Sequence, residues 1–192
     1  MKKKLLACFL CAVMAVTMAV PAFAADDAGG IPPTWPDYGM ANQHRNTTYC
    51  RLNVYISDPS KITNGTNVTV YKFDHVGNPT LIWAHQRLST GYYALRPVAS
   101  TGANPYVLNI NTSTKNCNLW AINQLPPEDY SIRFAHEGGD LRGVILIHRA
   151  LALTVSTEQM SAGGYNVKWE PSTGLPSTPT ANPQIWDCFP EV

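Results

Sequence analysis

The sequence predicts an all-β domain, and three observations support this prediction. Short runs that alternate β-branched or aromatic residues with small or polar ones recur along the chain, and turn-forming dipeptides separate them. Helical spacing of apolar residues is nearly absent after Pro36. Examples are the runs at residues 68–71, 92–95 and 143–147 and the turn dipeptides at residues 64–65, 138–139 and 163–164. Many short strands without intervening helices exclude a parallel βαβ fold and leave a barrel or a sandwich.

The first 24 residues are expected to be a removable signal peptide. Three lysines at residues 2–4 precede an uncharged apolar run at residues 5–20, and a small-x-small cleavage sequence ends at Ala24. The apolar run is about 16 residues long, which is shorter than the ~20 residues that a transmembrane helix needs. We therefore expect cleavage near Ala24 and a mature protein that is secreted or held at the cell surface.

The rest of the chain is expected to be a linker at residues 25–36 and a single domain at residues 37–192. The linker combines charge and glycine with three prolines, a composition typical of flexible or extended segments. A second polar segment, at residues 172–183, is rich in proline and threonine and is expected to be an inserted loop.

Charge and cysteine content narrow the classes of function. Without the signal peptide the chain holds 11 basic and 13 acidic residues. A nucleic acid or an anionic membrane is therefore not an expected partner, because binding phosphate needs clustered Lys and Arg. No second long apolar run is present, so the mature protein is not expected to span a membrane. Cys50, Cys117 and Cys188 allow at most one disulfide, and whether it forms stays open. No residues have the spacing of a metal site, and no cofactor is indicated.

A short pattern occurs three times in the predicted domain. Each copy places a polar residue between two apolar ones, and a polar stretch, a strand ending in an aromatic residue and a further strand follow it. The triplets are Leu52-Asn53-Val54, Leu108-Asn109-Ile110 and Leu153-Thr154-Val155, the aromatic residues are Tyr71, Trp120 and Trp169, and the further strands carry Trp83, Ile132 and Trp186. The last three residues lie 49 and 54 positions apart. One unit of about four strands cannot bury its apolar face alone, so three units are expected to pack together.

This pattern resembles the ricin-type lectin family, whose members fold as a β-trefoil of three repeats. The resemblance covers roughly residues 37–189, and Gln184-Ile185-Trp186 matches the Q-x-W signature of the family. The first repeat keeps the tryptophan as Trp83 but has Leu81 in place of the glutamine. The resemblance implies a β-trefoil, with a β-sandwich as the alternative. It also implies that Trp83 and Trp186 fill the centre of a barrel together with Ile132.

The resemblance further implies where a sugar would bind. Members of the family hold the sugar with an acidic residue in the triplet, an aromatic platform after it and amides near the Q-x-W tryptophan. The sugar stacks on the ring while short polar side chains bind its hydroxyls. No triplet here keeps the acidic residue, so binding is expected to be weak. The candidate ligand-binding residues are Asn109, Asn118, Trp120 and Asp129 in the second repeat and Trp169 and Gln184 in the third. The first repeat is expected to be empty, because Leu81 cannot bind a hydroxyl.

The sequence therefore predicts a secreted, lectin-like carbohydrate-binding module whose weak sites act together on a glycan or polysaccharide. The alternative is a non-enzymatic scaffold of the cell envelope, or a module that binds a cell-surface protein and has lost sugar binding. No nucleophile motif, carboxylate pair or phosphate loop is present, so enzymatic activity is not expected. Exposure of Trp120 or Trp169 distinguishes the two hypotheses, because a lectin presents such a ring to solvent and a scaffold buries both.

Overall fold

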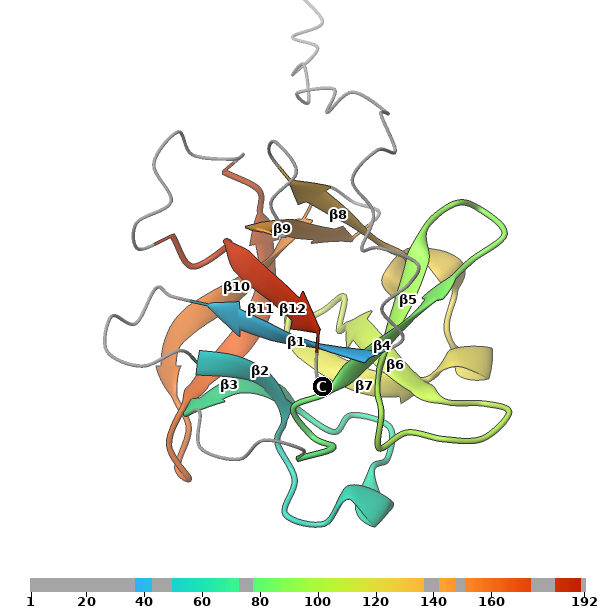
Figure 1. Ribbon diagram of the computed structural model, residues 1–192, viewed down its shortest axis with the longest axis horizontal. Coiled ribbons are helices and arrows are strands. Elements are labelled where there is room, and N and C mark those ends of the chain that lie inside the picture. The colour runs from blue at the N-terminus through green and yellow to red at the C-terminus, as the bar shows by residue number, and fades with distance from the viewer. Residues whose placement is uncertain are drawn as a thin grey trace, which may run out of the picture.

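The computed structural model (Figure 1) describes residues 37–42, 50–72, 78–136, 142–147, 151–173 and 182–190. The predicted signal peptide and linker lie outside these ranges, as does most of the predicted inserted loop at residues 172–183. In the described part of the chain, no helix is long and apolar enough to cross a membrane.

The regular elements of the described residues are twelve strands and three short 3₁₀ helices. The strands are β1 (Asp37–Asn42), β2 (Cys50–Val54), β3 (Val68–Lys72), β4 (Trp83–Arg87), β5 (Tyr93–Pro97), β6 (Tyr106–Ile110), β7 (Cys117–Ala121), β8 (Ile132–His136), β9 (Arg142–Ile147), β10 (Leu151–Gln159), β11 (Tyr165–Pro171) and β12 (Trp186–Pro190). The 3₁₀ helices are η2 (Pro59–Lys61), η3 (Ile122–Gln124) and η4 (Pro127–Asp129).

Six of the strands close into a barrel. β1 pairs with β12, β12 with β9, β9 with β8, β8 with β5, β5 with β4, and β4 returns to β1. Figure 1 shows β1 and β12 side by side across the centre of the view. Because the ladder ends where it began, none of these six strands has a free edge within the ring.

The other six strands form three hairpins, β2–β3, β6–β7 and β10–β11. Each hairpin follows one barrel strand and precedes another, so strands β1–β4, β5–β8 and β9–β12 are three copies of one unit. Each hairpin also contacts the next through one backbone bridge or ladder, and the three contacts form a closed cycle. They are Asn67 with Asn118, Asn116 with Lys168, and Asn166 with Thr69. The all-β and β-trefoil predictions are confirmed, and the sandwich alternative is excluded.

Three asparagines, one from each repeat, join the hairpins at this cycle. Nδ2 of Asn116 donates to Oδ1 of Asn67 at 2.7 Å, Nδ2 of Asn67 to Oδ1 of Asn166 at 3.1 Å, and Nδ2 of Asn166 to Oδ1 of Asn116 at 2.9 Å. Every member of the ring donates once and accepts once. Such bonds each contribute about 1 kcal/mol to stability, and the ring fixes the alignment of the three repeats.

The core is centred on equivalent residues of the three repeats. Trp83, Ile132 and Trp186 begin β4, β8 and β12, and their exposed fractions are 0%, 3% and 0%. Nε1 of Trp83 donates to the Leu52 carbonyl at 3.1 Å, and Nε1 of Trp186 donates to the Leu153 carbonyl at 2.9 Å. The predicted packing of both tryptophans with Ile132 in the core is confirmed.

The structure shows the state of two of the three cysteines that could form a disulfide. Cys117 and Cys188 are buried and free. Burial raises the pKa of both thiols well above the ordinary value, so neither is a reactive thiolate near neutral pH. The side chain of Cys50 lies outside the described residues.

Candidate functional site

The hairpins bring the polar residue of each triplet opposite one residue of the following strand. Asn109 faces Asn118 across β6–β7, Asn53 faces Thr69 across β2–β3, and Thr154 faces Lys168 across β10–β11. Because side chains alternate along a strand and the flanking Leu and Val or Ile residues are in the core, these polar pairs lie on the other face of each hairpin. The three pairs define equivalent candidate sites.

The third site is closed by its own hydrogen bonds. Nε2 of Gln184 donates to Oγ1 of Thr154 at 3.1 Å and to the Pro171 carbonyl at 3.0 Å. Its Oε1 accepts from N and Oγ1 of Thr173 at 2.9 and 3.0 Å. A glutamine amide has two N–H donors and two acceptor positions, so all four are used. Gln184, which is 3% exposed, holds the segment before β12 in place and has no hydrogen-bonding capacity left for a ligand.

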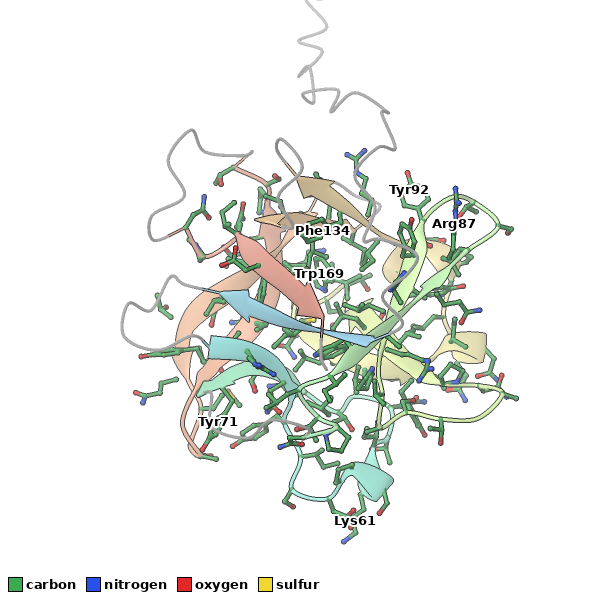
Figure 2. The ribbon with its side chains drawn as sticks, viewed as in Figure 1. Lys61, Tyr71, Arg87, Tyr92, Phe134 and Trp169 are labelled. Atoms are coloured by element: carbon green, nitrogen blue, oxygen red, sulfur yellow. The ribbon has the colours of Figure 1, made fainter. Side chains whose placement is uncertain are left out.

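The structure also corrects the prediction that Trp169 is a stacking platform. Its side chain is 1% exposed, and its Nε1 donates to the Asn109 carbonyl at 3.2 Å. Figure 2 shows Trp169 among the strands in the middle of the molecule, whereas Tyr71 lies towards the periphery. The pairings explain the difference, because Leu153 faces Trp169 in the same way that Leu52 faces Val70 and Leu108 faces Leu119. Trp169 is therefore equivalent to a core residue, and Glu170 occupies the outward position of Tyr71 and Trp120.

In the first repeat, Thr80 lies at the candidate site, and the sequence analysis did not predict it. Oγ1 of Thr80 lies 2.9 Å from Oδ1 of Asn53 and 2.8 Å from Oδ1 of Asn78. The resemblance to the lectin repeats pointed to Leu81 at this place, and Leu81 is buried and lies one position later. The signal available in the sequence was Asn78-Pro79-Thr80, since an asparagine two residues before a threonine commonly forms an Asx turn, as it does here. These groups bind one another, so the Oδ1 atoms of Asn53 and Asn78 both hold Thr80 in place.

The second repeat keeps open polar groups beside an aromatic ring. Nδ2 of Asn109 donates to Oδ1 of Asn118 at 2.7 Å. Oδ1 of Asn109 is buried and has no donor among the described residues. The amide group of Asn118 keeps both its N–H donors without an acceptor among the same residues. Asn118 is 5% exposed and Asn109 3%, so Asn118 is the less buried of the two, and Asn109 fixes the orientation of its amide.

Trp120 lies on the same face of β7 as Asn118, two residues further along the strand, and is half-buried. It borders the Asn64-Gly65 turn of the first repeat. A Cβ atom on Gly65 would lie 4.0 Å from Cζ3 of the indole, and N of Gly65 donates to the Leu119 carbonyl at 2.8 Å. Gly65 has a φ of 85°, a conformation that favours glycine. The indole is thus supported from the neighbouring repeat and retains part of its surface.

Asp129 ends η4 and is partly buried. It stands three residues before Ile132, as Thr80 stands before Trp83 and Pro183 before Trp186. The carbonyls of Thr80 and Pro183 each accept from the last triplet residue of their repeat at 3.0 Å. The repeat symmetry assigns Asp129 to the rim of the second site, and its role in binding a ligand stays a prediction.

Comparison with solved structures places this geometry among known trefoils. No family model and no curated protein matches the chain. The chain is similar to the designed three-fold symmetric protein ThreeFoil, with a TM-score of 0.58 and 20% identity over 80% of this chain and 97% of that one.

Two further solved structures, an agglutinin and a protein bound to a saccharide, are also similar in fold. The Rhizoctonia solani agglutinin has a TM-score of 0.56 and 17% identity over 84% of this chain and 99% of its own. SeviL, solved with the asialo-GM1 saccharide, has a TM-score of 0.52 and 12% identity over 83% of this chain and 100% of its own. At these identities the likeness shows the fold alone, and the fold is a β-trefoil.

Proposed function

We propose that this protein is a non-enzymatic carbohydrate-binding module whose main glycan site lies in the second repeat. The observation that carries the proposal is the Asn109–Asn118 amide pair beside the partly exposed Trp120. An indole face binds the apolar face of a sugar, and the amide donors of Asn118 bind its hydroxyls. The similar folds of an agglutinin and of a saccharide-bound lectin support this choice.

The proposed binding is weak. The pair has no carboxylate, so its hydrogen bonds to a sugar are neutral ones, about half as strong as charge-assisted bonds. Stacking and a few neutral bonds leave a net binding free energy of roughly 4–5 kcal/mol, which corresponds to a dissociation constant near the millimolar range. A module of this strength retains a polysaccharide only when several copies engage it together.

A direct test is titration of tryptophan fluorescence with oligosaccharides, comparing the native protein with Trp120→Ala and Trp169→Ala. We expect a saturable fluorescence change in the native protein and its loss in Trp120→Ala. Trp169→Ala should keep this change wherever the variant remains folded. If no glycan changes the spectrum at roughly tens of millimolar, the lectin proposal fails.

The second candidate is a scaffold or a module that binds a cell-surface protein. The closed third site and the buried Trp169 favour it, because two of the three repeats use their polar groups to hold the fold together. Binding to a cell-surface protein that Trp120→Ala leaves unchanged, together with no response to glycans, would support this candidate instead.

We also propose that the module acts outside the cytoplasm, on the basis of the signal sequence at residues 1–24. Intact-mass measurement of the exported protein tests this. The proposal expects a chain that begins at Ala25, and full-length protein retained in the cytoplasm would contradict it.

A further inference from the structure

An exposed pair of amide side chains lies across the junction of the first and second repeats. Nδ2 of Asn64 donates to Oε1 of Gln124 at 2.6 Å, and both residues are exposed. Asn64 belongs to the β2–β3 connection, and Gln124 is the last residue of η3, shortly after β7. Residues 60 positions apart in the sequence thus form one polar ledge.

The ledge is held rigidly although it is exposed. Oδ1 of Asn64 accepts from N of Ala121 at 2.9 Å, and the neighbouring Gly65 donates to the Leu119 carbonyl at 2.8 Å. The Asn64 side chain is therefore fixed by the backbone of β7. A side chain already held in one conformation loses little entropy when it binds a ligand, so each of its hydrogen bonds contributes more to affinity.

The ledge borders the same tryptophan as the proposed sugar site. Gly65 of the ledge turn lies beside Cζ3 of Trp120, and Asn64 binds the residue directly after Trp120. Along β7, Trp120 therefore lies between Asn118, which bonds Asn109, and Ala121, whose N–H holds Asn64. The backbone atoms that anchor the two pairs, at residues 118 and 121 of β7, are about 10 Å apart at the usual rise of a strand.

The ledge retains free hydrogen-bonding groups. Both N–H groups of Gln124 and one of Asn64 have no acceptor among the described residues. The four amides of the two pairs and the indole carry no charge, and Asp129 stands at the rim of the second site. The amide surface therefore suits hydroxyls and other neutral polar groups.

We infer that Asn64 and Gln124 form a second subsite, so that the second repeat recognises a neutral oligosaccharide of two or more units. One unit lies on Trp120 at the Asn118 amide, and the next lies against the ledge. This inference rests on the proposed function, since it extends the same site. In this arrangement, the preference for an oligosaccharide over a monosaccharide depends on the junction between the first and second repeats and not on the second repeat alone.

The test compares monosaccharides with short oligosaccharides on matched variants. The probes are galactose, glucose and N-acetylglucosamine, each as the monosaccharide, the disaccharide and the tetrasaccharide, and the readout is intrinsic tryptophan fluorescence. Gln124→Ala removes the two N–H donors that Gln124 contributes to the ledge. Asn123→Ala, which removes another exposed amide of the same 3₁₀ helix, is the matched control.

We expect at least one series in which the disaccharide binds the native protein about fivefold more tightly than the monosaccharide, the effect of one added neutral hydrogen bond. Gln124→Ala should remove this gain and leave monosaccharide affinity unchanged, and Asn123→Ala should keep it. Equal affinities across every series that binds, or a gain that persists in Gln124→Ala, overturn the inference while the proposed function stands. The absence of any response to all probes overturns both.

Discussion

The second and third repeats each carry a tryptophan near the end of the second hairpin strand, and they use it in opposite ways. Trp120 faces outward beside an amide pair that has unused donors. Trp169 is part of the core, and the Gln184 amide of the same repeat has no unused donor. The difference arises from one residue of register. Because side chains alternate across a strand, a shift of one position moves a residue from a ligand-accessible face to the interior.

The largest expected effect is on stability and separates the two tryptophans. Trp169→Ala should lower the free energy of unfolding by ~3–5 kcal/mol, as truncation of a fully buried large aromatic does. Trp120→Ala should lower it by about 1 kcal/mol, since the ring is partly solvated. Urea unfolding followed by circular dichroism measures both, and equal losses for the two variants would show that the assigned register is wrong.

A second expected effect concerns Gln184, which holds Thr154, Pro171 and Thr173 together. Gln184→Ala removes four hydrogen bonds of a buried amide and should lower the free energy of unfolding by about 2 kcal/mol. Glycan binding should not change, because the amide is fully used within the fold. Loss of binding at unchanged stability would restore Gln184 as a ligand residue.

A third expected effect is on glycan binding and concerns Asn118. Asn118→Ala should weaken glycan binding about fivefold, the effect of one neutral hydrogen bond. Lys168→Ala is the matched control, since Lys168 holds the same register position in the third repeat. Titration of both variants with the same oligosaccharide measures the two affinities. Equal weakening in the two would contradict a role of the Asn118 amide in the glycan site.

The smallest expected effect is on the stability of the protein at acid pH. Glu158 accepts from Asn166 and, at 3.0 Å, from Lys168, and these bonds lower the pKa of its carboxyl below the ordinary 4.5. A lowered pKa in the folded state stabilises the protein above the unfolded pKa, and this stabilisation is lost as the pH falls through the folded pKa. A carbon-13 titration of Glu158 should give a midpoint below 4.5 that rises in Lys168→Ala. A midpoint that does not move would show that Lys168 has no part in it.

The features of the fold that repeat in the sequence could be predicted. Three Leu-polar-Val or -Ile triplets and the spaced Trp83, Ile132 and Trp186 imply three units with one shared core, and each triplet leucine is 0% exposed. These positions follow from the alternation of apolar and polar residues along each strand, which can be seen in the sequence itself.

Register was harder to predict than fold. The loops inside the three hairpins differ in length, so counting from the triplet to the next aromatic residue aligned Trp169 with Trp120, although Trp169 pairs with Leu153 as Leu119 pairs with Leu108. The charge of Glu170 was the available signal, because a charged residue is expected at the outward position.

Contacts between repeats could not be predicted from spacing alone. The ring of Asn67, Asn116 and Asn166 and the Asn64–Gln124 ledge join residues that are 49 or more positions apart. Asparagine in a turn is favoured for local reasons, so nothing in the sequence separates those that cap a turn from those that reach another repeat.

The central claim, a glycan site at Trp120 in the second repeat, is tested most directly by following the indole N–H signals in a ¹H–¹⁵N NMR titration with an oligosaccharide that binds. The five tryptophans give separate probes, and three of them, Trp83, Trp169 and Trp186, donate their Nε1–H to backbone carbonyls in the core. The account predicts that the Trp120 signal shifts and saturates in the millimolar range while those three stay in place. A shift of Trp169 with Trp120 unmoved, or no shift of any indole at roughly tens of millimolar, would contradict it.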